Sequence, residues 1–457
     1  MTTVDLELLQ KYGRPGPRYT SYPTAVQFRR DFVASDLRRA IIRSNEAKDP
    51  PDLSLYFHFP FCDTLCYYCG CNMVITHNPA TIEDYLRYLK KEIDMVSGLL
   101  NDSRQVVQIH WGGGTPTYLS TDQIADIASY TARRFNISAD AEIGIEVDPR
   151  CLTEHHLPTI RQSGFNRVSF GVQDFDHRVQ ETVNRIQPES VTREVVEKSR
   201  ELDFESINVD LIYGLPFQSV ESYSKTMDRI IDIYPDRLAV FNYAHVPWMK
   251  KHQKLIPEDA LPAPIERLRI LKMVIDRLTG AGYVYIGMDH FAKPDDELSI
   301  ALKNHTLRRN FQGYGTHAEL NILAMGVSSI SELKDVYAQN SKSIADYKAR
   351  LDGGEIPTSL GCRLDADDRL RRYVIQELMC NSRVLKSEVK SRFDVDFDTY
   401  FANSLKQLRP FVDDDLVSMH AERLQVHEAG RLVIRSIAMV FDRYLQSDGE
   451  RVYSRTV

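Results

Sequence analysis

The feature that most constrains this chain is a cysteine-rich stretch between residues 56 and 71, Y-F-H-F-P-F-C-D-T-L-C-Y-Y-C-G-C. Four of the seven cysteines lie here, and Cys62, Cys66 and Cys69 have the spacing C-x3-C-x2-C. Three thiolates on one short loop can surround a compact iron–sulfur cluster. Because such clusters usually take four cysteines, a set of three leaves one position for a substrate or cofactor. The spacing therefore predicts a reactive metal cluster.

Two other interpretations of these cysteines fit less well. A structural zinc site usually joins two cysteine pairs separated by roughly a dozen residues or more, and four ligands at these tight spacings would strain a tetrahedron. Disulfides are disfavoured because the first residues, M-T-T-V-D-L-E, lack the positive and apolar segments of a secretory signal. We therefore expect a cytoplasmic protein in which Cys151, Cys362 and Cys380 are packed or idle thiols.

The cysteine triplet resembles the signature of the radical S-adenosylmethionine (SAM) enzymes, in which a [4Fe-4S] cluster exposes one iron to SAM. Cys71 follows as C-x-C, and residues 17–25 read P-R-Y-T-S-Y-P-T-A. This longer pattern resembles the family of oxygen-independent coproporphyrinogen III oxidases over nearly the whole chain. The resemblance implies that Cys62, Cys66 and Cys69 are the cluster ligands.

Cys71 calls for a separate interpretation. It follows Cys69 by two positions, so in an extended loop its side chain projects to the same side, close to the cluster. A fourth cysteine ligand would close the iron that SAM needs. We therefore predict a catalytic role for Cys71, serving a second SAM or the substrate radical. The alternative is a small buried thiol beside a turn.

A chain of 457 residues is long enough for two or three domains. Its net charge of −7 favours neither nucleic acid nor an anionic membrane as a partner. No apolar run approaches the ~18 residues of a membrane helix. We divide the chain into an N-terminal arm over the active site, a β/α barrel, a segment completing the active-site wall, and a C-terminal helical unit: residues 1–52, 53–290, 291–360 and 361–457.

From residue 53 onward, short β-rich runs alternate with amphipathic helical segments, which is typical of an α/β fold with a parallel sheet. One predicted helix begins at residues 81–84 with Ile82, Leu89 and Val96 on its apolar face, and Ser120 and Gln123 have the spacing of a capping box. Six units fit a partial (β/α)6 TIM-like barrel, as the family's fold also implies. The predicted strands are residues 53–58, 106–111, 142–147, 167–171, 206–211 and 237–242.

Polar or glycine-rich segments follow these strands. In parallel β/α folds the chemistry lies in loops at the carboxyl ends of the strands, so these groups should surround one mouth. Among them, Glu146 is suited to accept hydrogen bonds from a ribose diol, although a buried structural acid is the alternative. The segments are the cysteine loop, G-G-G-T-P-T at 112–117, E-V-D-P at 146–149, G-V-Q-D at 171–174, D-L-I-Y-G-L-P at 210–216 and N-Y-A-H-V-P at 242–247.

The resemblance implies contacts to two SAM molecules, which suits a substrate that must lose two carboxyl groups. Arg185 would be the bidentate partner of a SAM carboxylate, with a surface arginine as the alternative. The family often has Phe where this chain has Tyr68. For the first SAM the implied contacts are Tyr56, Gly113, Glu146 and Ile330. For the second they are Tyr68, Gly114, Thr115, Gln173, Arg185, Asp210 and Ala244.

After a predicted helix at 264–280, a glycine-punctuated region follows that neither helical nor strand periodicity explains. It contains N-F-Q-G-Y at 310–314 and M-G-V-S-S-I-S at 325–331, and we assign it to the far wall of the mouth. The family usually continues N-F-Q-G-Y with Thr-Thr and Gly-Asp, whereas residues 315–319 here are G-T-H-A-E. Because arginines suit planar carboxylates, our substrate candidates are Arg14, Arg18, Arg308 and Arg309, together with Phe311 and Gln312.

The segment from about 361 resembles a winged-helix arrangement. Leu370, Tyr373, Val374 and Leu378 form a helical stripe, residues 416–419 and 424–427 are expected to form a β-ribbon, and a final helix is expected over 431–445. The segment has sixteen Lys plus Arg and sixteen Asp plus Glu. A DNA-binding domain normally has a basic excess, so we expect a packing or lid role and no nucleic acid.

The resemblance implies oxidation of coproporphyrinogen III to protoporphyrinogen IX, with two propionates converted to vinyls. A 5′-deoxyadenosyl radical, formed from SAM by the reduced cluster, would take the propionate hydrogen. We expect a low-potential electron donor such as a flavodoxin or ferredoxin, no membrane partner, and a monomer. A heme-binding chaperone of the same superfamily and a simple iron–sulfur electron carrier are the alternatives. The C-x-C pair and the 17–25 arm argue against the chaperone, and the six β/α units with polar strand ends argue against the carrier.

Overall fold

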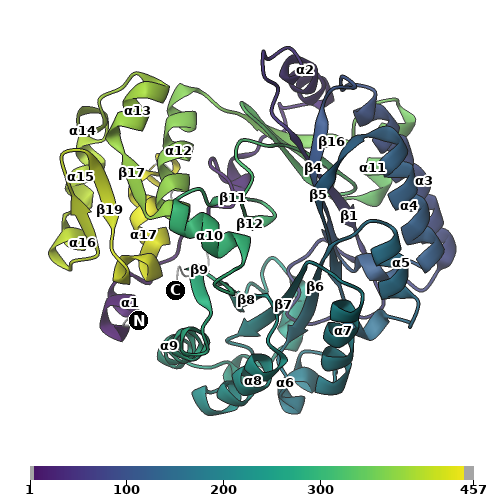
Figure 1. Ribbon diagram of the computed structural model, residues 1–457, viewed down its shortest axis with the longest axis horizontal. Coiled ribbons are helices and arrows are strands. Elements are labelled where there is room, and N and C mark those ends of the chain that lie inside the picture. The colour runs from purple at the N-terminus through teal and green to yellow at the C-terminus, as the bar shows by residue number, and fades with distance from the viewer. Residues whose placement is uncertain (1–4, 447–457) are drawn as a thin grey trace.

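The computed structural model describes residues 5–446 and is built around six parallel strands in chain order (Figure 1). All six predicted strands are confirmed, with ends that differ by at most a few residues on five of them and a longer N-terminal extension on β5. Each pairs in parallel with the next. Along β6 and β7 buried residues alternate with half-buried ones, because one face packs against the helices and the other lines a cavity. The strands are β1 (Leu53–Phe59), β4 (Gln105–Gly113), β5 (Asn136–Val147), β6 (Arg167–Gln173), β7 (Ser206–Tyr213) and β8 (Arg237–Asn242).

Amphipathic helices cover the outer face of this curved sheet (Figure 1). In the first of them the predicted apolar face is confirmed, because Ile82, Leu89 and Val96 are all buried. Its start is earlier than predicted, since Asn78 caps the helix and Pro79 occupies the first turn. The predicted capping box of Ser120 and Gln123 is also present. The helices are α3 (Pro79–Ser97), α4 (Thr121–Arg134), α5 (His156–Gln162), α6 (His177–Thr182), α7 (Glu189–Glu201), α8 (Val220–Ile233) and α9 (Pro264–Gly280).

The sheet extends beyond the six strands in both directions. At one edge the antiparallel strands β10 (His290–Ala292) and β9 (Val284–Gly287) follow β8. At the other edge β13 (Asn321–Met325) pairs in parallel with β1 and is followed by β14 (Ile330–Leu333), β15 (Val336–Asn340) and β16 (Thr358–Arg363). The partial barrel is therefore one part of a twelve-stranded sheet.

Residues 310–331, which no periodicity assigned to an element, contain regular strands in the structure. This region contains β13 and part of β14, and two short strands, β11 (Arg308–Asn310) and β12 (Gly313–Gly315), form a hairpin of their own. All five residues of β13 are buried, so its sequence N-I-L-A-M shows no alternation. Its partner β1 is about 270 residues away in sequence, and only tertiary pairing makes the segment a strand.

The C-terminal unit stands apart from the sheet in Figure 1 and combines helices with a small antiparallel sheet in the order β17-β19-β18. The predicted ribbon is confirmed by β18 and β19, and Leu370, Val374 and Leu378 are buried along α12. The elements are α12 (Ala366–Asn381), β17 (Arg383–Leu385), α13 (Lys386–Phe393), α14 (Phe397–Tyr400), α15 (Ala402–Gln407), α16 (Arg409–Asp413), β18 (Val417–Met419), β19 (Arg423–Val426) and α17 (Ile434–Ala438).

The continuous helix expected over residues 431–445 is wrong. Only α17 is α-helical, between two short 3-10 segments, Ala429–Val433 and Met439–Phe441. The side chains of Arg435 and Ser436 are buried and donate to backbone carbonyls of Pro17 and Tyr12 in the N-terminal arm. Contacts with the arm, which helical periodicity does not report, therefore determine the path of this segment.

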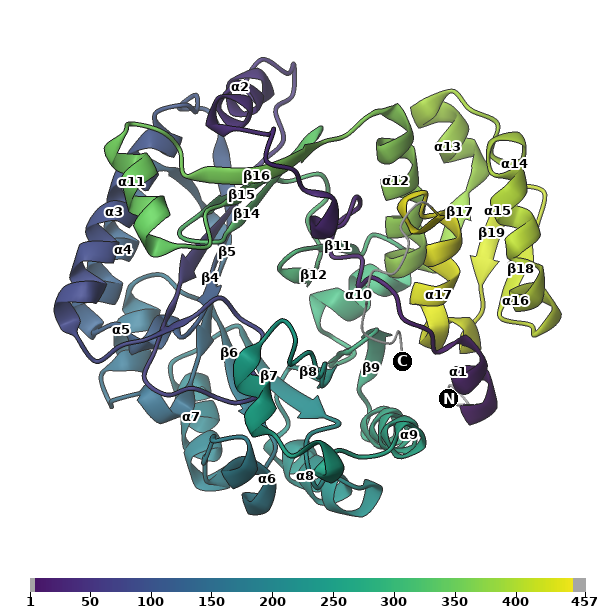
Figure 2. The same cartoon turned by 180° about the vertical axis from the view of Figure 1, so that it is seen from behind.

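The N-terminal arm runs between the C-terminal unit and the open side of the sheet (Figure 2). It begins with α1 (Leu6–Tyr12), as predicted, and also contains α2 (Ala34–Ser44), which the sequence interpretation did not identify. In the segment between these two helices, the carbonyls of Arg18 and Tyr19 accept hydrogen bonds from Arg309, at 2.8 and 2.9 Å. The glycine- and proline-rich segment is therefore ordered by the groups around it.

The remaining elements are short. The helices are α10 (Glu297–Asn304) and α11 (Ile344–Asp352), and the cysteine loop contains β2 (Phe61–Cys62) and β3 (Val74–Ile75). Along residues 5–446, none of the helices combines the length and the apolar character needed to cross a membrane.

A buried carboxyl on α3 connects this helix to the segment after β13, to β15 and to α11. Glu92 of α3 is fully buried and accepts hydrogen bonds from the Gly326 backbone, the Asn340 amide and the Tyr347 hydroxyl, at 2.8, 2.6 and 2.5 Å. Gly326 ends β13, so Glu92 fixes the turn that leads to Ile330. Burial raises the pKa of Glu92 to about 7, while its three donors oppose that rise.

We predict that Glu92 makes the protein less stable as the pH rises from about 5 to 7. A folded-state pKa above the unfolded one means that the folded chain holds the proton more tightly, so this contribution is present below pH 4.5 and is lost as pH rises through about 7. The slope is about 1.4 kcal/mol per pH unit in that interval. Melting curves at several pH values should show the wild type losing stability relative to Glu92→Gln. Parallel curves for the two proteins would contradict the raised pKa, and the exposed Glu194→Gln is the control.

Candidate active site

The cysteine loop lies at the carboxyl end of β1, between that strand and α3. A short parallel pairing of β2 with β3 closes the loop. The segment after β4 holds it from the other side, because the backbone N–H groups of Gly114 and Thr115 donate to the carbonyls of Phe59 and Phe61, both at 2.8 Å. The cysteines and the triple-glycine segment are thus fixed against each other, as predicted from the strand ends.

Each of the three predicted cluster ligands receives a hydrogen-bond donor at sulfur. Thr115 Oγ1 lies 3.4 Å from Cys62 Sγ, Arg185 Nη1 lies 3.7 Å from Cys66 Sγ, and the Cys71 N–H lies 3.4 Å from Cys69 Sγ. Donors and cations near sulfur favour the thiolate, which is the form that binds metal. The residues present therefore fit a cluster held by three cysteines. Across residues 5–446, no three or more His, Cys, Asp or Glu side chains are close enough to hold a single metal ion, which is smaller than a four-iron cluster.

Cys71 is exposed and sits beside Cys69, as the sequence interpretation expected. The pKa of Cys69 is lowered to about 6, chiefly by a hydrogen bond from the Cys71 thiol. A second loop covers this end of the site, where His252 Nε2 lies 2.7 Å from the Cys69 carbonyl and Lys250 Nζ donates to the Cys71 carbonyl at 2.9 Å. The loop that follows β8 therefore packs against the part of the cysteine loop that carries Cys69 and Cys71.

Glu146 ends β5 and faces the triple glycine. Its carboxylate accepts from the Gly113 N–H at 3.1 Å and lies 3.3 Å from His110 Nε2. A Cβ on Gly112 would come within 2.7 Å of the Glu146 carboxylate, and one on Gly113 within 2.7 Å of the His58 ring. Gly113 also has φ +118°, where L side chains are strained. Close packing against Glu146 and His58 thus requires glycine here, before any ligand is considered.

A cavity of about 240 Å³ brings together the residues predicted to contact the first SAM. Tyr56, Glu146 and Ile330 line it, and Gly113 adjoins it through the hydrogen bond to Glu146. Two substrate candidates, Phe311 and Gln312, line the same cavity. These residues come from β1, β5, the β11–β12 hairpin and β14, so the structure unites parts of the chain that are far apart in sequence.

The residues predicted to contact the second SAM are spread along several strand ends. Arg185 is buried and forms an ion pair with Asp148 at 3.0 Å, in addition to its contact with Cys66. Tyr68 and Gln173 lie close to Arg185. Asp210 is half-buried and lines a cavity of about 230 Å³ that shares Glu146, His110 and Gln312 with the first one. Burial, and then Glu146, raise the pKa of Asp210 to about 6. Thr115 lies at Cys62, and Ala244 lines a third cavity beyond β8.

The four arginines proposed for substrate carboxylates differ in their surroundings. Arg308 is paired with Glu377 at 2.6 Å, and Arg14 donates to the carbonyl of Ser436. Arg309 is buried against the arm, as described above, and supports Arg18 from behind. Arg18 is partly exposed and lines the cavity beyond β8. Of these four arginines, Arg18 lines one of the three cavities described here, and the other three arginines line none of them.

Several residues of the site were not identified from the sequence. His58 and His110 both line the cavity of Glu146, and His58 Nδ1 lies 3.2 Å from the Tyr56 hydroxyl. Both histidines occupy strands next to predicted site residues, at Y-F-H and H-W-G, which is the signal that could have identified them. Asp148 and Arg150 pair at 2.7 Å near Cys66. Asp148 was noted only as part of a strand end, and Arg150 was not noted.

Comparison with known proteins agrees with this geometry. Residues 56–230 match the model of the radical SAM superfamily, and residues 364–433 match that of the HemN C-terminal domain. The chain is 46% identical to an oxygen-independent coproporphyrinogen III oxidase of Synechocystis sp. over 456 residues, 99% of this chain and 97% of the relative. The Escherichia coli relative of the same name is 45% identical over 454 residues, 99% of this chain and 98% of the relative.

This chain belongs to the oxygen-independent coproporphyrinogen III oxidase family. A solved structure of coproporphyrinogen III oxidase (HemN) from Escherichia coli, described as a radical SAM enzyme, matches with a TM-score of 0.92 and 44% identity, over 97% of this chain and 99% of that one. As a member of this oxidase family, the chain is a radical SAM oxidoreductase whose cofactors are a [4Fe-4S] cluster and SAM. The fold class predicted from the sequence is confirmed.

For this oxidase we predict that Glu146→Gln weakens SAM binding by about 10- to 100-fold, the loss of one hydrogen bond to a charged group. The carboxylate accepts from Gly113 and faces the Tyr56 cavity, so the amide would keep its size but lose its charge. Calorimetric titration with SAM on the anaerobically reconstituted protein gives the affinity, and 5′-deoxyadenosine release gives cleavage. The exposed Glu154→Gln is the matched control. Wild-type affinity and cleavage in Glu146→Gln would show that Glu146 is only a structural acid.

Proposed function

We propose that this chain converts coproporphyrinogen III to protoporphyrinogen IX without oxygen, by oxidative decarboxylation of two propionates to vinyls in heme biosynthesis. The observation that carries the proposal is the near full-length identity of 46% to a relative of that name, in a chain whose triple-glycine segment contacts both the cysteine loop and Glu146. The propionate C–H bond is unactivated, and no side-chain acid or base breaks it at neutral pH. The chemistry that the cluster and SAM supply when bound is radical removal of a hydrogen atom.

The protein's part is to hold and orient the reactants. We assign the cluster to Cys62, Cys66 and Cys69, whose sulfurs accept from Thr115, Arg185 and the Cys71 backbone. For the first SAM, Glu146 would bind the ribose hydroxyls in the cavity that it shares with Tyr56 and Ile330. Since a small displacement of reacting atoms is costly in rate, the fixed contact between Glu146 and Gly113 is suited to this role.

A second SAM is supported by the stoichiometry, because two propionates lose their carboxyl groups. Its proposed contacts are Tyr68, Gly114, Thr115, Gln173, Arg185, Asp210 and Ala244. Arg185 donates to the Gly171 carbonyl and to Asp148, which orients its guanidinium next to Cys66. The pKa of Asp210, raised to about 6, makes this carboxyl able to exchange a proton near neutral pH.

A basic surface of this chain beside the cysteine loop is suited to dock the electron donor. Residues 246–257 include Lys250, Lys251, His252 and Lys254 and no acidic residue, in a chain of net charge −7. Lys250 and His252 contact the carbonyls of Cys71 and Cys69, while Lys251 and Lys254 are exposed. Complementary charge favours an acidic one-electron carrier of the flavodoxin or ferredoxin class. We propose that the chain receives electrons here as a cytoplasmic monomer.

The decisive experiment is anaerobic incubation of the reconstituted protein with coproporphyrinogen III, SAM and a reductant, followed by product analysis. We expect protoporphyrinogen IX, with carbon dioxide and 5′-deoxyadenosine. A protein that bound heme tightly and never decarboxylated coproporphyrinogen would support the chaperone interpretation instead.

For Cys71 we predict that Cys71→Ser keeps the iron content and absorption spectrum of the cluster but reduces formation of protoporphyrinogen IX about 100-fold or more, the scale of losing one proton- or hydrogen-transfer group. Its thiol is exposed beside Cys69 and is not needed as a ligand. Cys362→Ser is the matched control. A lost cluster would make Cys71 a ligand, and unchanged turnover would exclude a catalytic role.

For the donor surface we predict that Lys251→Glu/Lys254→Glu raises the KM for a flavodoxin about 10-fold at low salt and less at high salt, because both lysines are exposed. Turnover with a small chemical reductant should be unchanged. The control is Lys225→Glu/Lys272→Glu, on the helices α8 and α9. Equal effects with both reductants would contradict a docking role.

A further inference from the structure

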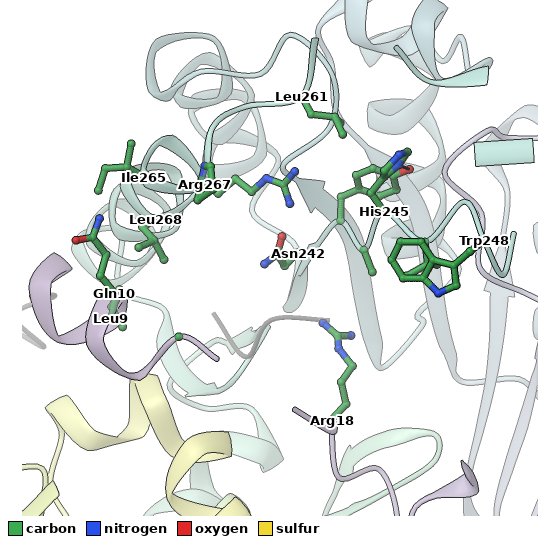
Figure 3. Close-up of a pocket in the computed structure, with 15 residues that line it drawn as sticks. Leu9, Gln10, Arg18, Asn242, His245, Trp248, Leu261, Ile265, Arg267 and Leu268 are labelled. Atoms are coloured by element: carbon green, nitrogen blue, oxygen red, sulfur yellow. Dashed lines mark hydrogen bonds between the residues drawn. The ribbon is translucent and has the colours of Figure 1, made fainter. Parts of the chain in front are cut away.

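The largest of the described cavities lies outside the cysteine loop. It has a volume of about 550 Å³, within the usual ~300–1,000 Å³ range of ligand pockets. Its walls come from α1 and Arg18 of the arm, the loop after β8, and the first two turns of α9 (Figure 3). Ala244, a proposed contact of the second SAM, follows the carboxyl end of β8 and lines this cavity. The cavity therefore adjoins the mouth of the barrel.

Two guanidinium groups face this cavity from opposite elements. Figure 3 shows Arg18 reaching in from the arm and Arg267 from α9, with the side chain of Asn242 between them. Arg267 Nε donates to the Pro262 carbonyl at 3.1 Å, which fixes the direction of its guanidinium. Arg18 is held by Asp289 at 3.2 Å and by the Phe241 ring at 5.9 Å. Both arginines are therefore directed by neighbours toward one space.

The floor on the Arg18 side has more positive than negative charge. Arg435 lies close enough to Arg18, Arg309 and Asp289 for each of them to affect its pKa, which burial and then Arg18 lower to about 10. Within residues 5–446, the guanidinium groups of Arg18, Arg309 and Arg435 are thus gathered around the Asp289 carboxylate. An anion bound at Arg18 would relieve the repulsion among these guanidinium groups. This local gathering of arginines contrasts with the net charge of −7 of the whole chain.

The other walls are apolar or aromatic. Trp248 is 59% exposed and borders the cavity, and Leu9, Leu261, Ile265 and Leu268 complete its apolar lining. The Asn242 Oδ1 atom is buried and has no hydrogen-bond partner among the described residues. A macrocycle of apolar pyrrole rings with carboxylates at its edge and N–H groups at its centre matches this combination of walls.

We propose that this cavity binds the edge of the tetrapyrrole whose propionates are not converted, with Arg18 and Arg267 each holding one carboxylate and Trp248 contacting the ring face. The inference deepens the proposed function and rests on it. Coproporphyrinogen III carries four propionates and two survive the reaction, which matches two arginines. Among the described residues, none of the cysteine loop lines the cavity, but Gln253 donates to the carbonyls of both Ala244 and Tyr68 and so connects the cavity wall to that loop.

The test measures binding of coproporphyrinogen III and of its tetramethyl ester under anaerobic conditions. The chain has two tryptophans, of which Trp111 is buried and Trp248 is exposed, so the longer-wavelength emission typical of an exposed tryptophan reports on the cavity. Losing a hydrogen bond to a charged group should weaken binding of the acid about 10- to 100-fold in Arg18→Gln or Arg267→Gln. The ester should bind these variants and the wild type alike. KM should rise more than kcat falls, because the held carboxylates do not react.

Arg269→Gln is the matched control, since Arg269 lies two residues further along α9 and is exposed, away from the cavity lining. Arg267→Lys should recover part of the affinity, because it keeps the charge without the fork of donors. Iron content and melting temperature report on folding. Wild-type affinity for the acid in both Arg18→Gln and Arg267→Gln would overturn this inference and leave the proposed function intact. Absence of turnover by the wild type would overturn the proposed function itself.

Discussion

The close contact between β1, β4 and β5 at their carboxyl ends is the constraint on which the rest of this structure depends. Glu146 and His58 occupy the space next to Gly112 and Gly113, and the Gly114 and Thr115 backbones bind the cysteine loop. Because these contacts are made by backbone groups and by the Glu146 and His58 side chains next to glycines, they fix three strand ends relative to one another. The cysteines proposed as cluster ligands and the carboxylate proposed to bind the ribose are therefore positioned by the same packing.

The outer parts of the chain complete a site that the six β/α units leave open. β13 and β14 add Ile330 and the neighbouring serines to the Glu146 cavity, and Glu92 holds the turn between the two strands. On the other side, the arm is held by buried side chains of the C-terminal unit, notably Arg435. Through these contacts the C-terminal unit determines where Arg18 lies, although it is far from the cysteine loop in sequence.

Charge is distributed unevenly in a way that suits the proposed chemistry. The chain is acidic overall, yet the loop over Cys69 and Cys71 is basic and the cavity beyond β8 contains arginines from two elements. A substrate with four carboxylates and an acidic electron carrier both need local positive charge. Both regions involve the loop that follows β8, whose residues 242–246 and 248 line the cavity and whose lysines follow at positions 250, 251 and 254.

The sequence by itself determined the six parallel strands and the polar groups at their ends, and it supplied the cysteine spacing from which the cluster ligands are predicted. These depend on local patterns: the cysteine spacing, the runs of β-branched residues and the capping signals, as at Ser120 and Gln123. Only the tertiary structure decided that β13 pairs with β1, that residues 434–438 form a short helix against the arm, and that Arg267 faces Arg18. Each of these depends on contacts between segments hundreds of residues apart, or on the direction in which one side chain of an amphipathic helix points. Burial and charge from distant segments determine such features, and no local pattern records them.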